Sequence, residues 1–302
     1  MDGWDNGIIP ENEIIEYLQP SIEDFSKATC LVLPSGGVKG VYLIGAIEYL
    51  YENCGINHIE SYYGTSVGSI ISGLLIIGFT PLEILVYICV HKIIDTLLAS
   101  FSLSKILIEK KSVLDSSVFI NVLSEMIKTK IGYIPTLGQL YSVFGKRLCI
   151  VTISRDNPTT PLYISSHSHP DLSMVQALHM SSSIPFVFGY ATYENIQYFD
   201  GGVLDQFPIL YASKKEESIF GIDILCAFDK SEELWIDIIN VISLPIHFIN
   251  ETLKKQLTHG TYIEIQSDGE FVTKNSKDII MMFESGYRQC KNKLLKKKIK
   301  QH

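Results

Sequence analysis

Apolar residues along this chain form short runs that alternate with stretches of helical spacing. A short apolar run bounded by turn residues predicts a buried strand, whereas apolar residues three or four positions apart predict a helix. The predicted strands are 29–33, 59–63, 147–154, 162–165, 196–199, 219–225 and 261–266. The predicted helices are 38–52 ending at Gly55, 67–78, 81–98, 115–130 with Asp115 as N-cap, and 172–180 with Asp171 as N-cap. This alternation predicts an α/β fold with three α/β/α layers and a largely parallel central sheet.

The chain carries neither an internal repeat nor a Pro- or Gly-rich linker, so residues 28–290 are predicted to form one domain. Its flanks differ in charge. Residues 1–27 form an acidic extension with seven acidic residues and one lysine, and residues 291–302 form a basic tail with six lysines and no acid. Such a tail is either a solvated helix end or a contact with an anionic membrane surface.

One uncharged stretch, residues 61–82, is long enough to cross a bilayer. Gly, Ser and Pro residues interrupt it, so it predicts the end of a strand followed by a buried helix. Residues 1–26 contain seven acidic residues and no Lys or Arg, which differs from an export signal. We therefore expect a cytoplasmic protein, with peripheral membrane contact as an alternative that remains open.

The charge balance and the cysteines exclude several classes of function. A net charge of −8 argues against a protein that binds nucleic acid. The six cysteines are scattered, with no C-x-x-C pair and no histidine at zinc-ligand spacing, so we expect buried thiols and no metal. His167 and His169 lie close together, but a polar surface loop accounts for them better than a metal site. No organic cofactor is indicated either.

The segment Tyr63–Ser69 fits the pattern G-x-S-x-G, with Ser66 at its centre. It leaves a predicted strand and opens a predicted helix, the context in which this motif presents a nucleophilic serine on a tight turn. Side chains at Gly64 and Gly68 would collide with the neighbouring backbone. The helix that begins at Val67 would direct its N-terminal dipole towards the site. The alternative is a packing turn without chemistry.

A glycine-rich loop, Pro34–Gly40, follows the first predicted strand and opens the first predicted helix. Unpaired amides in such a loop bind a phosphate or stabilise an oxyanion. The loop lacks the spacing of a nucleotide-binding P-loop, and a serine motif follows on the next strand, so an oxyanion hole is the better interpretation. The predicted donors are the amides of Gly36, Gly37 and Val38. Lys39, just before Gly40, either supports the loop, binds a lipid phosphate or is simply solvated.

A third motif, Asp200-Gly201-Gly202, ends a predicted strand 134 residues beyond Ser66. The Asp followed by two glycines could be only a turn. A carboxylate placed there could equally face the nucleophile and accept its proton.

Together these motifs make the sequence resemble the patatin-like phospholipases. The matching segments, in the order of that family, are Ser35–Gly40, Gly64–Gly68, Met180–Phe188 and Asp200–Gly202, and the resemblance spans residues 28–210. It implies a three-layer α/β/α catalytic domain and a Ser-Asp dyad in which Ser66 attacks an acyl ester and Asp200 takes its proton. The implied substrate is a phospholipid or another acyl lipid, and no cofactor is implied.

The sequence departs from the family pattern in two places. Ser35 stands where the family usually has the first glycine of its loop, and Pro34 stands where an Asp is common. The segment Asp205–Pro208 replaces the usual Asn-x-Pro, and we expect Phe207 and Pro208 to keep the chain turning.

Two other functions stay open. His247 and His259 follow Asp200 in the order Ser, Asp, His of α/β-hydrolases, so a Ser-Asp-His triad is the alternative mechanism. The other alternative is a non-catalytic module that binds a lipid surface. Residues near Phe101 and Leu103 are predicted to form an apolar rim that meets such a surface.

Overall fold

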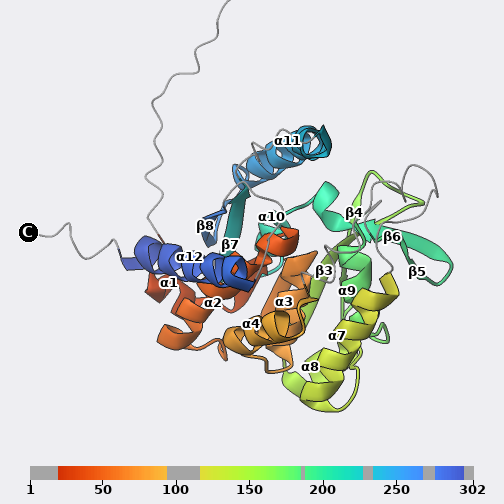
Figure 1. Ribbon diagram of the computed structural model, residues 1–302, viewed down its shortest axis with the longest axis horizontal. Coiled ribbons are helices and arrows are strands. Elements are labelled where there is room, and N and C mark those ends of the chain that lie inside the picture. The colour runs from red at the N-terminus through yellow and green to blue at the C-terminus, as the bar shows by residue number, and fades with distance from the viewer. Residues whose placement is uncertain (1–19, 94–115, 185–187, 227–233, 268–275, 296–302) are drawn as a thin grey trace, which may run out of the picture.

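The computed structural model describes residues 20–93, 116–184, 188–226, 234–267 and 276–295. These residues form one mixed sheet with helices on both faces (Figure 1). The strands are β1 Cys30–Leu33, β2 Ser61–Thr65, β3 Arg147–Ser154, β4 Pro161–Ser165, β5 Ala191–Tyr193, β6 Ile196–Asp200, β7 Ile219–Cys226 and β8 Thr261–Ser267. The α-helices are α1 Ile22–Lys27, α2 Gly40–Cys54, α3 Val67–Ile76, α4 Pro81–Val90, α7 Ser116–Ile131, α8 Leu137–Phe144, α9 Met174–Ser182, α10 Ile209–Ser213, α11 Leu234–Lys254 and α12 Ser276–Leu295. Two short 3₁₀ helices are η1 Gly37–Lys39 and η2 Gly201–Val203.

The sheet has the order β5-β6-β3-β2-β1-β7-β8, and β4 also pairs with β3. The strands from β3 through β2, β1 and β7 to β8 are parallel, whereas β4 and β6 run antiparallel to β3 and β5 runs antiparallel to β6. The predicted largely parallel sheet is thus confirmed, with antiparallel strands added at one side.

Strand β3 determines where β2 and β6 end. Its residue Val151 pairs with Thr65 of β2, and the next residue, Thr152, pairs with Asp200 of β6. Because β4 occupies the other edge of β3, β2 and β6 follow one another along the same edge. The last residues of β2 and β6 therefore meet, although they are far apart in sequence.

The side chains of β1 alternate between two cores. Leu31 and Leu33 lie in the larger cluster with residues of α2, α3, α9 and α12, while Cys30 and Val32 lie in the smaller cluster with residues of α10. Figure 1 shows most helices on one side of the sheet and α10 and α11 on the other. The predicted three α/β/α layers are confirmed, with one helical layer much thinner than the other.

The hydrophobic pattern missed several elements, including α1 and α10, and two others show why. One is β5, which has three residues. The other is α8, which begins with a capping box in which Thr136 and Gln139 bond each other's backbone amides. The spacing of Thr136 and Gln139 was a usable sequence signal.

Some predicted helix ends were wrong or cannot be compared. The N-cap of α9 is Ser173 and not Asp171, because the Ser173 hydroxyl accepts the amide of Gln176. The single helix predicted over 81–98 is wrong, because α4 ends at Val90 and His91 and Lys92 form a turn. The predicted N-cap Asp115 lies outside the described residues.

The ends of the described chain pack on the core. Phe25 of α1 is fully buried and its ring lies 5.2 Å from that of Phe220. At the other end α12 continues to Leu295, and Leu294 is buried. The core therefore includes residues from both flanking segments, and the predicted division into extension, domain and tail stays a prediction.

The uncharged stretch 61–82 contains β2, α3 and the start of α4. Among the described residues, no single helix has the length and apolarity to span a membrane. The helices α3 and α4 reach that length only as a pair bent by 118°.

Candidate active site

Ser66 occupies the turn between β2 and α3 and has an unusual backbone conformation. Its φ of 53° and ψ of −121° lie outside the regions that most residues adopt. Such conformations cost about 1–3 kcal/mol and occur preferentially at functional sites. The turn lifts Ser66 out of the sheet at the start of α3, where amides without helical acceptors gather.

The glycines beside Ser66 are required by close backbone contacts. A Cβ atom on Gly64 would lie 2.5 Å from the amide nitrogen of Ser69. A Cβ atom on Gly68 would lie 2.5 Å from the carbonyl oxygens of Leu33 and Pro34. The tight turn therefore has the steric origin that the sequence predicted.

The glycine-rich loop folds into η1, with Gly36 as its N-cap. The first amides of a helix have no acceptor within the helix, so those of Gly37 and Val38 are available to a ligand. Among the described residues, none other than its chain neighbours has a heavy atom within 4 Å of the place of a Cβ on Gly37. The loop is thus open at Gly37, which leaves room for a ligand beside it.

This loop lies against the Ser66 turn. A Cβ atom on Gly40 would lie 2.4 Å from Cγ2 of Val67, so the N-termini of α2 and α3 touch. The positive ends of both helix dipoles therefore face one region, next to Ser66.

Lys39 is buried, with 4% of its surface exposed. The interpretation of Lys39 as a solvated lysine is therefore wrong. Its place in η1 fits support of the loop better than contact with a lipid phosphate, which would need an accessible ammonium group.

Asp200 ends β6 and lies beside Ser66. The Gly202 amide donates a hydrogen bond to its Oδ1 at 2.7 Å. Ser66 and Asp200 are only 3% and 5% exposed. Burial raises the pKa of Asp200 from 3.8 to about 6, while the Ser66 side chain and the Gly202 amide limit the rise. The carboxylate is thus a stronger base than an exposed Asp and lies next to a hydroxyl.

The turn after Asp200 packs tightly on both sides. A Cβ atom on Gly201 would lie 2.6 Å from the carbonyl of Val151, and one on Gly202 would lie 2.9 Å from Oγ of Ser35. Ser35, which departs from the family pattern, therefore fits against the Asp200 turn.

The unusual segment Asp205–Pro208 connects the three motifs. The carbonyl of Asp205 accepts the Thr65 hydroxyl at 3.0 Å, and the carbonyl of Gln206 accepts the Ser35 amide at 2.8 Å. Phe207 is buried in the smaller core, and Pro208 is the N-cap of α10. The segment thus turns the chain and anchors it beside both the serine turn and the loop.

The geometry gives no support to the histidine alternative. His247 is exposed on α11, and Nε2 of His259 lies 3.1 Å from the carbonyl of Glu216. His259 and Glu216 precede β8 and β7, whereas Ser66 follows β2, so they lie at opposite ends of these parallel strands. Among the described residues, the groups that shift the pKa of Asp200 include no histidine.

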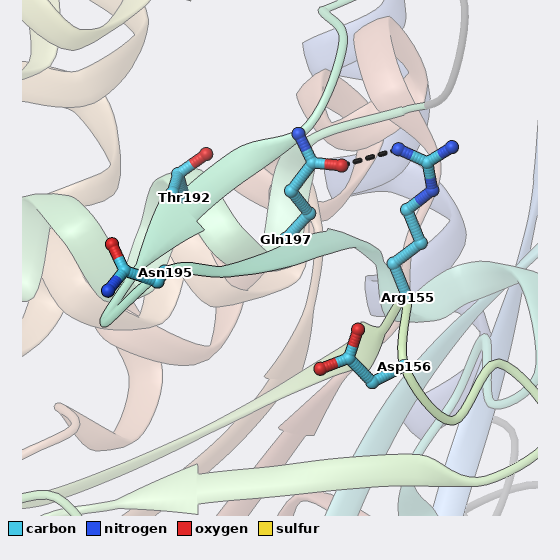
Figure 2. A pocket seen from close by; sticks show the side chains of 5 residues that line it. All are labelled: Arg155, Asp156, Thr192, Asn195 and Gln197. Carbon is cyan, nitrogen blue, oxygen red and sulfur yellow. Dashed lines mark hydrogen bonds between the residues drawn. The ribbon is translucent and has the colours of Figure 1, made fainter.

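A separate polar pocket of about 510 Å³ runs along the β5–β6 hairpin. Figure 2 shows its lining residues, with the side chains of Arg155 and Gln197 hydrogen-bonded to each other. Neither Ser66 nor Asp200 lines this pocket.

Sequence reasoning missed the role of Ser181. Its hydroxyl accepts a hydrogen bond from the Ser66 amide at 3.0 Å. The available signal was the segment Met180–Phe188, which resembled a family segment but gave no role to any side chain.

Comparison with known proteins yields two curated relatives. Probable lipid hydrolase 463L of Invertebrate iridescent virus 6 is 33% identical over 189 residues, which cover 61% of this chain and 63% of that protein. The chain therefore spans less than two thirds of the length of this relative. Uncharacterized protein R571 of Acanthamoeba polyphaga mimivirus is 26% identical over 282 residues, covering 88% of this chain and 93% of that protein.

Among solved structures, VipD from Legionella pneumophila has a similar fold. Its TM-score is 0.52 at 16% identity, with 88% of this chain and 66% of VipD covered. The family model of the patatin-like phospholipases matches residues 31–213, which is more than half of the chain and includes Ser66, Asp200 and the glycine-rich loop. The chain therefore belongs to the patatin-like phospholipase family.

Proposed function

We propose that this protein is a serine hydrolase that cleaves fatty-acyl ester bonds of phospholipids or other acyl lipids. The observation that carries the proposal is the position of Ser66 beside the buried Asp200 carboxylate, whose pKa burial raises to about 6. Family membership and the relative named a probable lipid hydrolase support the substrate class.

In the first step the Ser66 oxygen attacks the ester carbonyl carbon while its proton passes to Asp200. The tetrahedral intermediate collapses, and the leaving alcohol takes the proton from Asp200. Water then attacks the acyl-enzyme, with Asp200 again accepting a proton, and the fatty acid leaves as Ser66 recovers its hydrogen. No histidine and no metal takes part in these steps.

The oxyanion of the intermediate would lie beside η1. The amides of Gly37 and Val38, with that of Gly36 as a further candidate, would donate to it, and each well-placed donor lowers the barrier by about 2.7–4 kcal/mol in serine hydrolases. The adjoining N-termini of α2 and α3 add a favourable field.

The competing function is a lipid-surface module that keeps the fold without hydrolysis. Both functions require contact with lipid, so binding to vesicles does not separate them. The burial of Asp200 beside a nucleophile favours the enzyme, because a buried carboxylate with only neutral partners costs stability that a binding module has no reason to retain.

The test is hydrolysis of mixed phosphatidylcholine and phosphatidylglycerol vesicles, with products identified by mass spectrometry. The wild type should release fatty acid and lysolipid, and Ser66→Ala should release about a thousandfold less or none. Equal release by both proteins would overturn the proposal. Vesicle binding by Ser66→Ala without hydrolysis would show that the two properties are separable.

A further inference from the structure

The C-terminal turn of α9 contacts the backbone on both sides of the Ser66–Asp200 pair. This turn contains three consecutive buried serines, Ser181, Ser182 and Ser183. It lies over β3 at the point where β2 and β6 both end, as the pairs of Val151 with Thr65 and of Thr152 with Asp200 show.

Ser181 bridges the end of the β2–β3 ladder. Its hydroxyl accepts the Ser66 amide at 3.0 Å and donates to the carbonyl of Val151 at 2.7 Å. Thr65, just before Ser66, is the residue that pairs with Val151, so the amide and the carbonyl are neighbours at the last rung. The side chain is 0% exposed, so no solvent replaces its two bonds.

The same turn holds the strand that carries Asp200. The Asp200 amide donates to the carbonyl of Ser183 at 3.0 Å. The Thr152 hydroxyl lies 2.9 Å from the carbonyl oxygens of both Met180 and Phe199. One turn of α9 thus fixes the nucleophile through Ser181 and the base through Ser183 and Thr152.

We infer that Ser181 is a positioning residue: its hydroxyl holds the strained Ser66 turn so that the Ser66 oxygen faces Asp200. The inference rests on the proposed function, because it assigns Ser181 to the same reaction. Without the hydroxyl, the Ser66 amide and the Val151 carbonyl would be buried without partners, and the turn would shift to satisfy them. A shift of about 1 Å at a reacting group costs about a hundredfold in rate.

The neighbouring serines provide matched controls. The Ser182 hydroxyl donates to the carbonyl of Leu178 at 2.7 Å, and the Ser183 hydroxyl donates to that of His179 at 2.7 Å. Both bonds stay within α9. Ser182→Ala therefore removes a buried hydroxyl from the same helix without removing a bond to the Ser66 turn.

The experiment compares Ser181→Ala with Ser182→Ala in the full chain. Hydrolysis of p-nitrophenyl butyrate gives kcat and KM, and a fluorophosphonate reagent measures the reactivity of Ser66 directly. In that labelling step the Ser66 oxygen bonds to phosphorus, fluoride leaves, and the hydroxyl proton passes to Asp200. We expect kcat and the labelling rate of Ser181→Ala to fall about 10- to 100-fold with KM within about twofold, whereas Ser182→Ala stays within about twofold of wild type.

Two further readouts separate positioning from loss of fold. Ser181→Thr keeps the hydroxyl and should restore labelling, whereas Ser181→Val, of the same volume, should not. Hydrogen exchange of the peptide that contains Ser66 should be faster in Ser181→Ala than in Ser182→Ala, and this readout needs no activity.

Equal labelling rates and equal exchange in the two alanine variants would overturn the inference while leaving the proposed function intact. Conversely, a wild type that neither hydrolyses ester nor labels at Ser66 would overturn the proposed function. Hydrogen exchange would then still decide whether Ser181 holds the turn.

Discussion

Asp200 and Asp223 are both buried carboxylates on strands of one sheet, yet their partners differ. Asp200 accepts a hydrogen bond from the Gly202 amide and lies beside the Ser66 hydroxyl. Asp223, fully buried on β7, lies 3.0 Å from the ammonium nitrogen of Lys254, which also lies 2.8 Å from Glu264 and 2.5 Å from Glu251. One carboxylate has neutral partners, and the other is part of an ion cluster.

The difference separates a reactive group from a structural one. Burial raises the pKa of Asp200 to about 6, because its neutral partners only partly stabilise the charge. Burial raises the pKa of Asp223 as well, but the Lys254 ammonium opposes that rise. Burial also lowers the pKa of Lys254, yet the surrounding carboxylates outweigh it and raise the pKa above its ordinary value. Asp200, with neutral partners, can accept and release a proton at a pH near 6. Asp223, with a cation as partner, fixes α11 to the sheet.

The three carboxylates of the cluster, Asp223, Glu251 and Glu264, are close enough to hold a metal ion. The Lys254 ammonium lies between them and already supplies the positive charge. We therefore interpret the cluster as an internal ion pair network that attaches the end of α11 to β7 and β8.

The largest effect on activity is expected at Asp200, the carboxylate that has neutral partners. Asp200→Asn keeps an oxygen for the Gly202 amide but removes the base, so kcat should fall about 10²- to 10⁴-fold. Its urea unfolding midpoint should not fall, because a buried charge is removed. Steady-state ester hydrolysis and urea titration measure both quantities. Activity within tenfold of wild type would mean that Asp200 is not the base.

A change at Lys254 removes the cation of the ion cluster and should affect stability more than activity. Lys254→Met should lower the free energy of unfolding by about 3–5 kcal/mol, because buried carboxylates lose their cation. The activity of the folded fraction should remain near that of the wild type. Adding Asp223→Leu to Lys254→Met should recover part of the loss in a urea titration. If Lys254→Met alone were as stable as the wild type, Lys254 would not be the cation that stabilises the buried carboxylates.

The pH dependence should differ in sign for activity and stability. Asp200 acts as a base only when deprotonated, so kcat/KM should fall about tenfold per unit below pH 6 and level off above it. Asp200 binds its proton more tightly in the folded chain than in the unfolded chain, where its pKa is about 3.9. Its contribution therefore lowers stability as the pH rises from 4 to 6.

A second buried acid provides the control for this profile. Burial raises the pKa of Asp205 to about 6, although the Tyr163 hydroxyl donates to its Oδ2 at 2.6 Å. Asp205→Asn should keep the acid limb of the activity profile. If that limb disappears in Asp205→Asn, the limb belongs to Asp205 and not to Asp200.

The smallest effect is expected at the histidines. Replacing His247 and His259 together by Gln should change kcat by less than about twofold, because neither contacts the dyad. A loss of more than about a hundredfold, the effect of a missing acid–base catalyst, would favour the triad. The kcat of the double variant in ester hydrolysis decides between the dyad and the triad.

Most of the site could be predicted because its motifs are local. The turn at Ser66, the loop before Gly40 and the turn after Asp200 each need particular residues within a few positions, so the sequence displays them. Predicted strands and helices agree with the structure for the same reason. Phe101, Leu103 and the end of the basic tail, 296–302, lie outside the described residues, so the predicted membrane contacts stay predictions.

The features that the sequence did not predict depend on contacts between distant segments. The role of Ser181 depends on where α9 lies over β3, and nothing near Ser181 in sequence indicates Ser66. The burial of Lys39 and the ion cluster of Lys254 likewise follow from packing. A short strand such as β5 has too few residues for a periodic pattern.

The shared edge of β3 also constrains how the molecule folds. Ser66 and Asp200, its proposed base, lie 134 residues apart in sequence, and they meet only after β6 has paired with β3 beyond the end of β2. Such non-local pairings form late, since they carry the entropy cost of closing a long loop. A folding intermediate in which β2 has paired with β3 but β6 has not would thus still lack Asp200 beside Ser66. Hydrolytic activity should therefore be among the last properties that a refolding chain regains.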